Sequence, residues 1–262
     1  MDTALVIGYG EVGYALALVL DGEHEVDVYD TRPGFQVPGR RGYDVMHICF
    51  PYSETFMRDV VAYKIAYEPK QTVIHSSVPI GTTRLLDASH SPVIGIHPSL
   101  EESVRTFTKF IGGPYASQVA DHFRRAGIRV YIVDDSETTE LMKLMSTTLY
   151  GVCIEFTKEV KRLCNEHNVP FEAWTLWTNA YNEGYAKMGR PEYTRPNLTA
   201  ISTRIGGHCV LPNASMVGSR FADLIKELNG DEQTRLLEEA DGGDPNHSSG
   251  REEDVGGPST RA

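Results

Sequence analysis

Short apolar runs separated by polar and glycine-rich segments fill the first half of the chain. The runs at 4–7, 25–29, 45–50, 72–76, 93–96 and 129–133 resemble buried strands, and helix-like stretches such as 14–20 lie between them. This alternation predicts an N-terminal Rossmann-like α/β domain with a doubly wound parallel sheet. The link between Asp30 and Asp44 is rich in Gly, Pro and Arg, so we expect a loop there instead of a crossover helix.

The pattern changes at Ser136, where a long segment without proline begins and predicts one helix that ends before Pro170. A second helix is expected over 171–187, then a Pro-rich loop at 190–197 and a last helix over 214–228 that stops at Asn229-Gly230. We therefore expect a dinucleotide-binding domain at 1–135 and a smaller all-helical substrate and dimerisation domain at 136–230. The first helix has an apolar stripe that suits a core or an interface: Leu141, Leu144, Met145 and Leu149.

Acidic residues are concentrated at the C-terminal end. Residues 231–262 hold nine Asp and Glu against three Arg, and large apolar side chains are scarce there. Such a segment buries too little surface to offset the entropy of ordering, so we expect a disordered acidic tail at 231–262. The formal net charge of −11 also argues against a nucleic-acid partner, because phosphate binding calls for a basic face.

The compartment is expected to be the cytoplasm. No apolar run approaches the roughly 20 residues that span a bilayer, and Met1 leads directly into a strand-like run without a signal peptide. The four cysteines are unevenly spaced, unlike a disulfide framework, and fit a reducing environment. We expect no membrane partner.

The loop after the first strand has the glycine spacing of a dinucleotide-binding fingerprint. Its residues, which we expect to contact a cofactor, are Gly8, Tyr9, Gly10, Glu11, Val12 and Gly13. The first glycine permits a tight turn, the second lets a pyrophosphate approach the backbone, and the third allows close packing of helix and strand. The N-terminus of the helix that follows attracts phosphate.

Asp30 ends the next strand, at the spacing of a ribose-binding carboxylate. It favours NAD, because it would repel the 2′-phosphate of NADP, although the nearby Arg32 could hold that phosphate. Pro51 and Ser76 complete the expected cofactor site. A glycine-rich turn of this kind also occurs where another adenosine ligand such as S-adenosylmethionine binds, or where none does, so those alternatives stay open.

A glycine-rich turn also precedes Cys209, in the sequence Gly206-Gly207-His208-Cys209. The other three cysteines lie in apolar runs typical of packed thiols. A thiol in such a turn, downstream of a dinucleotide fingerprint, indicates redox chemistry through a covalent sulfur intermediate. A packed thiol is the alternative interpretation.

Four blocks together resemble the UDP-glucose and UDP-N-acetylmannosamine dehydrogenase family, within the 6-phosphogluconate-dehydrogenase-like superfamily. The blocks are the glycine loop, the Ser76–Thr83 segment (SSVPIGTT), Thr139–Leu144 (TELMKL) and Ile205–Pro212. The resemblance spans about residues 3–229. It implies two successive hydride transfers from a sugar alcohol to NAD, with a cysteine that captures the aldehyde and a thioester that is then hydrolysed.

The family's site residues carry over to matching positions in this chain. Cys209 matches the nucleophile, and Lys143 matches the lysine that orients water and stabilises oxyanion charge; without the resemblance, Lys143 would be interpreted as a solvated residue on a helix surface. Ser77 replaces the family's Thr and keeps a hydroxyl. Two positions depart from the family: Thr147 stands for Asn, and Asn213 stands for the Asp four residues after the cysteine.

These departures put thioester hydrolysis in question, since a neutral amide has no base of useful pKa. The glutamate that the family carries near Pro98-Ser99-Leu100 is also missing, although Glu101 and Glu102 follow. The family has a third domain over the uridine nucleotide, and this chain becomes acidic where that domain would begin. Two-electron and four-electron oxidation both stay open.

Two further residues are candidates on their own chemistry. His97, in a His-Pro pair like that of prephenate-dehydrogenase-like enzymes, could accept a proton from an alcohol, or be an ordinary turn histidine. Arg204 could bind a substrate anion, or form a surface salt bridge. With Gly206, Gly207 and His208 it makes up the expected substrate site. His75, His97, His208 and Cys209 lack the short spacing of metal ligands, so no metal is expected.

The function expected from the sequence is an NAD-dependent dehydrogenase that oxidises an alcohol of a polar, anionic substrate. A homodimer formed through the helix that begins near Ser136 is implied by the resemblance. The alternatives are a transferase that uses S-adenosylmethionine and a non-catalytic ligand-binding or scaffold protein.

Overall fold

The computed structural model describes residues 1–201, 203–207 and 209–241. The expectation for His208 and the part of the expected 231–262 tail that covers 242–262 lie outside these residues. Among the helices of the described residues, none has both the length and the apolarity needed to cross a lipid bilayer.

The first half of the chain forms one seven-stranded sheet with the strand order β2-β1-β3-β4-β5-β6-β7. Within the described residues, the β5–β6 pair of this sheet is antiparallel and its other strand pairs are parallel. The strands are β1 Thr3–Ile7, β2 Glu25–Tyr29, β3 Val45–Ile48, β4 Gln71–Ile74, β5 Ser89–His90, β6 Lys109–Gly112 and β7 Val130–Val133. The predicted Rossmann-like sheet is confirmed, and the segment from Asp30 to Asp44 is the loop that its composition predicted.

Helices cover both faces of the sheet and enclose two apolar cores. One core packs α1 Glu11–Leu20, α4 Leu100–Thr106 and α5 Ala116–Arg125 against the sheet. The second core lies on the opposite face, under α2 Phe56–Tyr67 and the residues next to α3 Thr82–Leu85.

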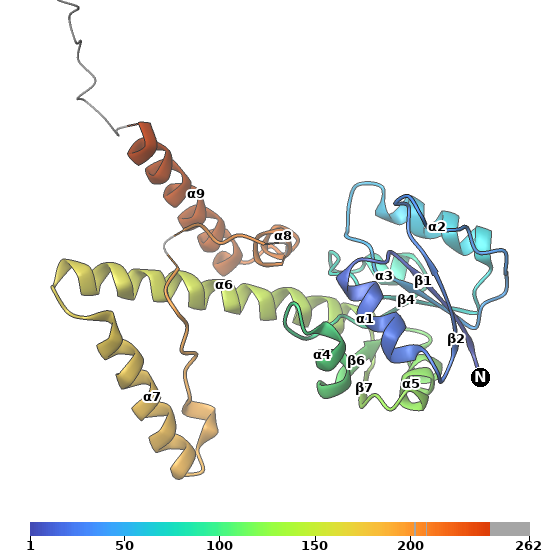
Figure 1. Cartoon of the computed structure of the whole chain (residues 1–262), viewed down its shortest axis with the longest axis horizontal. Coiled ribbons are helices and arrows are strands. Elements are labelled where there is room, and N and C mark those ends of the chain that lie inside the picture. The colour runs from blue at the N-terminus through green and yellow to red at the C-terminus, as the bar shows by residue number, and fades with distance from the viewer. Residues whose placement is uncertain (202, 208, 242–262) are drawn as a thin grey trace, which may run out of the picture.

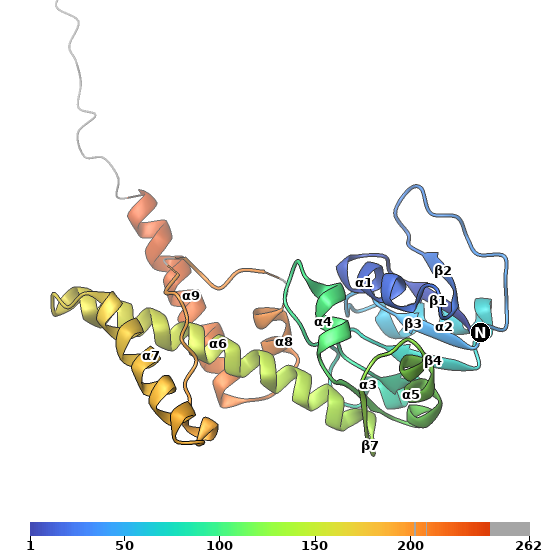
Figure 2. The ribbon, with the colours of Figure 1, turned by 60° about the horizontal axis from the view of Figure 1, so that its bottom comes forward.

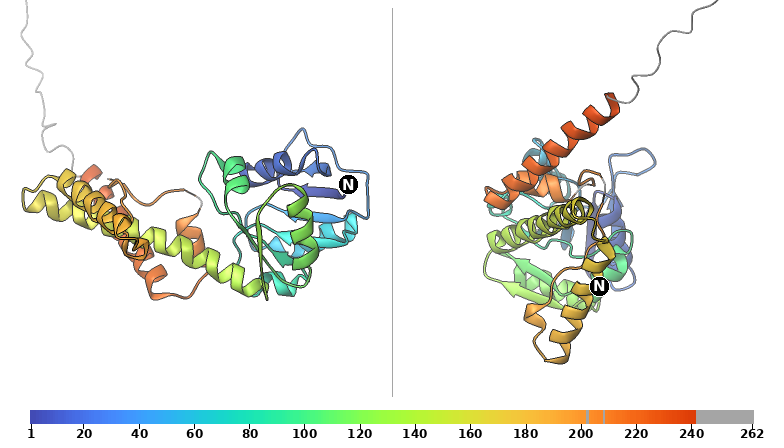
Figure 3. Two further views of the ribbon diagram at one scale, coloured as in Figure 1. Left: turned by 90° about the horizontal axis from the view of Figure 1, so that it is seen from below. Right: turned by 90° about the vertical axis from the view of Figure 1, so that its left-hand side faces the viewer.

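The remaining helices form an elongated second part, as expected. Its axis is α6 Ser136–Glu166, which starts against the sheet and runs away from it (Figure 1). Asp135 caps α6, since its carboxylate accepts a hydrogen bond of 2.7 Å from Thr138 N. The other elements are α7 Phe171–Lys187, the short 3-10 helix η1 Pro191–Tyr193, α8 Val210–Ser215 and α9 Arg220–Asp241. Figure 2 and Figure 3 show that α7 folds back from the far end of α6 while α8 lies nearer the sheet.

The fifth strand lies earlier than predicted. Residues 93–96 are not a strand; β5 is Ser89–His90, and the chain leaves the sheet at Pro92, whose missing N–H cannot extend the ladder. The following strand β6, which begins with the charged Lys109, was not predicted. Its antiparallel pairing departs from the expected all-parallel sheet.

The C-terminal helix also differs from its prediction. The segment expected as one helix over 214–228 forms parts of two, α8 and α9, separated at residues 216–219. The expected stop at Asn229-Gly230 is wrong, because α9 continues to Asp241. The side chain of Asn229 is used elsewhere: its Oδ1 accepts a hydrogen bond of 2.7 Å from Ile205 N and ties the loop before Cys209 to α9.

The glycine loop is shaped by two close approaches of the backbone. Gly8 has φ of +89°, and a Cβ there would lie 2.8 Å from Phe50 N. A Cβ at Gly13 would lie 1.9 Å from Gly8 O, so only glycine lets α1 start this close to β1. Gly10 differs, since a Cβ there would meet no atom within 4 Å. Packing therefore requires glycine at Gly8 and Gly13 but not at Gly10.

We expect Gly13→Ala to lower the free energy of unfolding by about 1–3 kcal/mol, because the added methyl forces α1 away from β1. Gly10→Ala is the matched control and should unfold at nearly the same urea concentration as the parent chain. Urea denaturation followed by circular dichroism measures both. Equal stability of the two variants would contradict this interpretation of the loop.

Candidate functional site

A buried carboxylate fastens the loop after β4 to the first turns of α6. Glu140 is fully buried, and its two oxygens accept hydrogen bonds of 2.6 Å from Gly81 N and 2.8 Å from Thr83 N. Burial raises the pKa of Glu140, and the two N–H donors act in the opposite direction. This anchor sets where every α6 residue of the next turn lies relative to the sheet.

His90 makes a second connection between the same elements. Its Nδ1 lies 2.8 Å from Thr139 Oγ1 on α6, and its Nε2 lies 3.1 Å from Ser76 O. Burial lowers the pKa of His90 to about 4, so the ring is neutral near pH 7 and Nε2 can donate to the carbonyl while Nδ1 accepts from the hydroxyl. Ser76 in turn donates from Oγ to Phe50 O at 2.5 Å. Ser76 is therefore held to the residue that precedes Pro51.

Lys143 lies one helical turn beyond Glu140. Its Nζ donates a hydrogen bond of 2.8 Å to Val93 O. Burial lowers the pKa of Lys143, and the charge of the Cys209 thiolate counteracts that effect. Cys209 is exposed at the start of α8. Lys143 and Cys209 therefore lie close enough for their charges to interact. Ser77 lies in the adjoining loop between Ser76 and Gly81.

The two departures from the family pattern contact each other. Asn213 is 3% exposed, and its Nδ2 donates to Thr147 Oγ1 at 3.0 Å. The Thr147 hydroxyl lies within hydrogen-bond distance of two helix carbonyls, Lys143 O at 3.1 Å and Leu144 O at 2.9 Å. Donor and acceptor are complementary, so the pair satisfies its own hydrogen bonds without a charge.

Asp30 lies beside the glycine loop with both carboxylate oxygens engaged. Its Oδ2 accepts from Tyr9 N at 2.7 Å, and Arg32 adds bonds from its backbone N and Nε, both at 2.9 Å, and from a terminal nitrogen at 3.2 Å. Burial raises the pKa of Asp30, but these hydrogen bonds outweigh it and hold the pKa below its usual value. Arg32 also donates to Tyr9 O at 2.6 Å, so its side chain joins Asp30 to the glycine loop.

His97 lies at the same end of α1. Its Nδ1 pairs with the Glu11 carboxylate, which places His97 over the first turn of the helix that follows the glycine loop. Sequence reasoning put Glu11 and His97 in separate sites, one for a cofactor and one for catalysis. The structure brings these two residues together.

The expected substrate residues lie on an open segment. Arg204, Gly206 and Gly207 are exposed, and His208 is outside the described residues. A cavity of about 440 Å³ lies between this segment and α6, and it is lined by Tyr150, Ile154, Leu198, Thr199, Ile201, Ile205, Gly206 and Val210. Its lining is largely apolar, unlike the expected anion site.

Glu140 and His90 were missed as site residues. Glu140 belongs to the Thr139–Leu144 block, where its charge favoured a helix start, yet a carboxylate one turn before the lysine could have been paired with the N–H groups of the Gly81 turn. His90 had no sequence signal, since a two-residue strand carries no periodicity.

We expect Asn213→Asp to lower stability at neutral pH by about 1–3 kcal/mol, because a buried carboxylate would replace the amide donor beside Thr147 Oγ1. Burial would raise the pKa of the new carboxyl above its unfolded value. The loss should therefore shrink as pH falls through that folded pKa. Urea titrations at several pH values measure it, with Thr147→Ser as a control that keeps the hydroxyl. A pH-independent loss, or none, would contradict this.

No protein-family model matches the chain, and no curated protein matches it in sequence. Solved structures do match the chain in fold. The UDP-D-ManNAc dehydrogenase of Pyrococcus horikoshii superposes with a TM-score of 0.72 at 17% identity, over 91% of this chain and 72% of that one. The UDP-glucose dehydrogenase of Pyrobaculum islandicum gives 0.72 at 18% identity, over 93% and 72%. The Mycobacterium tuberculosis 3-hydroxyisobutyrate dehydrogenase gives 0.65 at 12%, over 88% and 93%. The chain therefore has the fold that these dehydrogenases share, which confirms the fold implied by the sequence resemblance.

Proposed function

We propose that the protein is an NAD-dependent dehydrogenase that oxidises an alcohol of a polar, anionic substrate, of the nucleotide-sugar class or smaller. The observation that carries the proposal is the convergence of Lys143, Cys209 and the Ser76–Thr83 segment. That segment follows β4, and the glycine loop follows the parallel strand β1, so both lie at the carboxyl edge of the sheet. This edge is where open α/β sheets bind their ligands.

The cofactor end of the site fits a dinucleotide. No side chain caps the N-terminus of α1, and the space beside Gly10 is open, so the first backbone N–H groups of the helix can receive a pyrophosphate. Asp30 can accept ribose hydroxyls once Arg32 turns away from it. When bound, NAD would supply the hydride acceptor for alcohol oxidation.

The residues at the other end have distinct roles in this proposal. The Lys143 ammonium would stabilise negative charge that develops on a substrate oxygen. Cys209 is exposed, so an aldehyde can reach its sulfur. Asn213 is neutral and donates to Thr147, so it cannot activate water. This favours a two-electron oxidation over the complete four-electron sequence.

The other candidate functions use the same fold. If the protein is a transferase, S-adenosylmethionine would bind at the same glycine loop. NADP is a further alternative cofactor, because Arg32 could bind its 2′-phosphate. A non-catalytic ligand-binding or scaffold protein is supported by the replacement of the family's Asn and Asp by Thr147 and Asn213.

We expect NADH to bind, and to bind more tightly than NADPH or S-adenosylmethionine, because Asp30 repels a 2′-phosphate and the α1 N-terminus needs a pyrophosphate. Isothermal titration calorimetry on the full chain tests all three ligands. Gly10→Ala should weaken NADH binding by about tenfold or more, since its methyl lies where the pyrophosphate approaches.

Cys209→Ser is the matched control and should leave NADH affinity unchanged. Tighter binding of NADPH would assign Arg32 to a phosphate, and tighter binding of S-adenosylmethionine would favour the transferase. Absence of NADH binding would overturn the proposed function.

We also propose a homodimer formed through α6 and α7. Leu141, Leu144 and Met145 of the predicted stripe pack on α8 and α9 within the chain, whereas Leu149 is 63% exposed. Trp177 on α7 is 71% exposed. Tyr150 and Phe156 are also exposed on α6, and α7 diverges from it (Figure 1). Large exposed apolar side chains gathered on two consecutive helices are typical of protein interfaces.

Light scattering coupled to gel filtration should give twice the monomer mass for the full chain. Trp177→Lys should shift that mass toward the monomer, because it places a charge on the exposed α7 surface. Glu172→Lys, which introduces the same side chain at an exposed polar position in the first turn of α7, is the control and should stay dimeric. A monomer mass for the parent chain would contradict the dimer.

A further inference from the structure

A line of buried polar side chains crosses the core beneath α1 and α5. His47 on β3 and His75 after β4 occupy positions that face this core, where neighbouring strand residues are apolar. Both are buried, as are Lys109 on β6 and His122 on α5. Burial of four such groups is costly unless each has partners. The contacts among these four side chains therefore determine whether the buried arrangement is stable.

Successive members of the line are within hydrogen-bond distance. Asp2 Oδ2 lies 3.3 Å from His122 Nδ1, and His122 Nε2 lies 3.2 Å from His47 Nε2. His47 Nδ1 lies 3.1 Å from His75 Nε2, and His75 Nδ1 lies 3.3 Å from Lys109 Nζ. Each of the three imidazoles uses both ring nitrogens.

The line runs from the amino ends of the strands, the amino edge of the sheet, to their carboxyl ends, the carboxyl edge. Asp2 precedes β1 and lies at the amino edge, where its carboxylate is partly exposed and pairs with Arg125. His75 follows the last residue of β4, at the carboxyl edge. Lys109 begins β6, which is antiparallel to β5 and pairs His90 with Gly112. The start of β6 therefore lies beyond the carboxyl end of β5.

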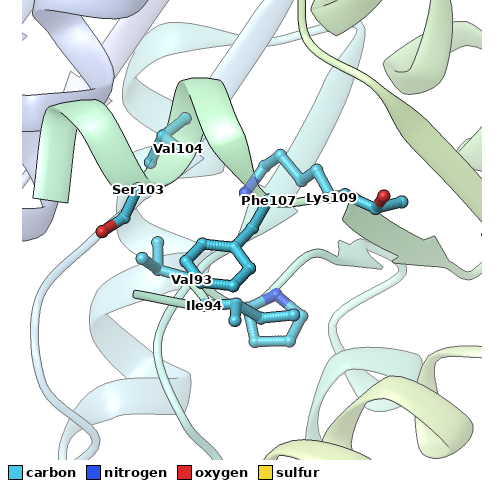
Figure 4. Close-up of a pocket in the computed structure, with 8 residues that line it drawn as sticks. Val93, Ile94, Ser103, Val104, Phe107 and Lys109 are labelled. Carbon is cyan, nitrogen blue, oxygen red and sulfur yellow. The ribbon is translucent and has the colours of Figure 1, made fainter. Parts of the chain in front are cut away.

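The Lys109 end lies next to the proposed site. Lys109 Nζ is 3.1 Å from Ser91 O and 5.0 Å from the centre of the Phe123 ring. Lys109 and Val93 both line a cavity of about 10 Å³ (Figure 4), and Val93 O accepts the hydrogen bond from Lys143. Val93 therefore contacts Lys143 and lines the same cavity as Lys109.

Counting protons constrains the line. Ser91 O lies 2.7 Å from His75 Nδ1, so the three imidazoles have an acceptor at each end, the Ser91 carbonyl and the Asp2 carboxylate. Three neutral imidazoles carry three N–H protons, but the four links between these ends need four. We propose that the line is a proton relay that holds one excess proton and exchanges it between Lys109 at the carboxyl edge and His122 beside Asp2 at the solvent edge.

The relay has two states with the same number of protons. In the first, the Lys109 ammonium donates to His75 Nδ1, the Nε2–H groups of His75 and His47 donate onward, and His122 donates from Nδ1 to Asp2. Transfer begins when His75 Nδ1 receives a proton from Lys109. His75 then releases its Nε2 proton to His47 Nδ1, and His47 releases its own to His122 Nε2. Lys109 ends neutral, and His122 becomes an imidazolium paired with the Asp2 carboxylate.

The first state is favoured at rest. Burial lowers the pKa of Lys109 to about 7, and Cys49 counteracts this while Lys143 reinforces it. Burial lowers the pKa of His122 to about 4; His24 and Arg125 act in the same direction, and Asp2 opposes them. The pKa values of His47 and His75 are lowered mainly by burial and by neighbouring His and Lys charges. Lys109 is thus the most basic member.

The solvent end has the composition of a metal site, because ligand atoms of Asp2, His24 and His122 lie within 4.8 Å of one another. Its geometry suits a relay better. The rings of His24 and His122 stack at 3.9 Å with 23° between their planes. Lone pairs on imidazole nitrogens lie in the ring planes, and two nearly parallel planes do not converge on one ion. Arg125 already neutralises the carboxylate. His24 Nε2 lies 3.0 Å from His122 O and must donate to it, and His24 Nδ1 has no hydrogen-bond partner among the described residues.

Long-range proton–nitrogen correlation NMR on the full ¹⁵N-labelled chain tests the relay, since it distinguishes bare from protonated ring nitrogens. Below about pH 7, His75 and His47 should be protonated at Nε2 and His122 at Nδ1. As pH rises through the pKa of Lys109, the His75 proton should move to Nδ1, and the three rings should titrate with one shared midpoint. Independent midpoints, or unchanged tautomers, would overturn the proposal.

Lys109→Met should place the His75 proton on Nδ1 throughout this range. Lys143→Met makes the same substitution at the lysine on the other side of Val93. It should keep the pH-dependent change of the His75 tautomer, with the midpoint moved to higher pH because a neighbouring positive charge is lost. The pH titration of the parent chain decides the matter if Lys109→Met does not fold. Saturable shifts of His24 and His122 on addition of Zn²⁺ at one equivalent would instead assign a metal site and overturn the relay.

The use of the relay rests on the proposed function. Oxidation of an alcohol releases its hydroxyl proton in addition to the hydride, and the relay offers that proton a route from the carboxyl edge to solvent at the opposite edge. The NMR experiment needs neither substrate nor cofactor. If the NMR result supports the relay but NADH does not bind, the relay is retained and the dehydrogenase proposal fails.

Discussion

The position of the candidate site depends on the Glu140 carboxylate. Its two hydrogen bonds, to Gly81 N and Thr83 N, join the loop after β4 to α6 in a fully buried setting. A buried carboxylate is costly unless donors satisfy it, so this contact tolerates little displacement. Lys143 lies one turn further along α6, and its place against Val93 follows from the anchor. A long helix that begins at the sheet thus carries both the site and the second part of the fold.

Burial determines the pKa values of the two lysines at the carboxyl edge of the sheet. Lys143 and Lys109 both have a lowered pKa because they are desolvated, and they lie on either side of the segment that contains Val93. Cys209, by contrast, is exposed. The Thr147–Asn213 pair is neutral and self-satisfied, so the positive charge of Lys143 has no carboxylate partner among these site residues. Such a site favours binding of an anion or stabilisation of an oxyanion.

Much of the fold could be predicted because its signals are local. The glycine loop, the start of α6 at Ser136 and the bounds of α7 all follow from spacing, charge and proline positions. The misses depend on tertiary contacts. β5 has two residues and no period, β6 begins with a buried lysine, and α9 passes through Gly230 while Asn229 bonds to a distant loop. The contact between Thr147 and Asn213 spans 66 positions, so neither residue alone indicated its partner.

The central claim is that the α6 anchor and the glycine loop build one site at the same edge of the sheet. A crystal structure of the full chain with NADH tests it most directly. We expect the pyrophosphate on the first turn of α1, Arg32 turned away from Asp30, and the nicotinamide beside Lys143 and Cys209. A nicotinamide that points away from Lys143 and Cys209, with the adenosine bound at the glycine loop, would contradict the claim.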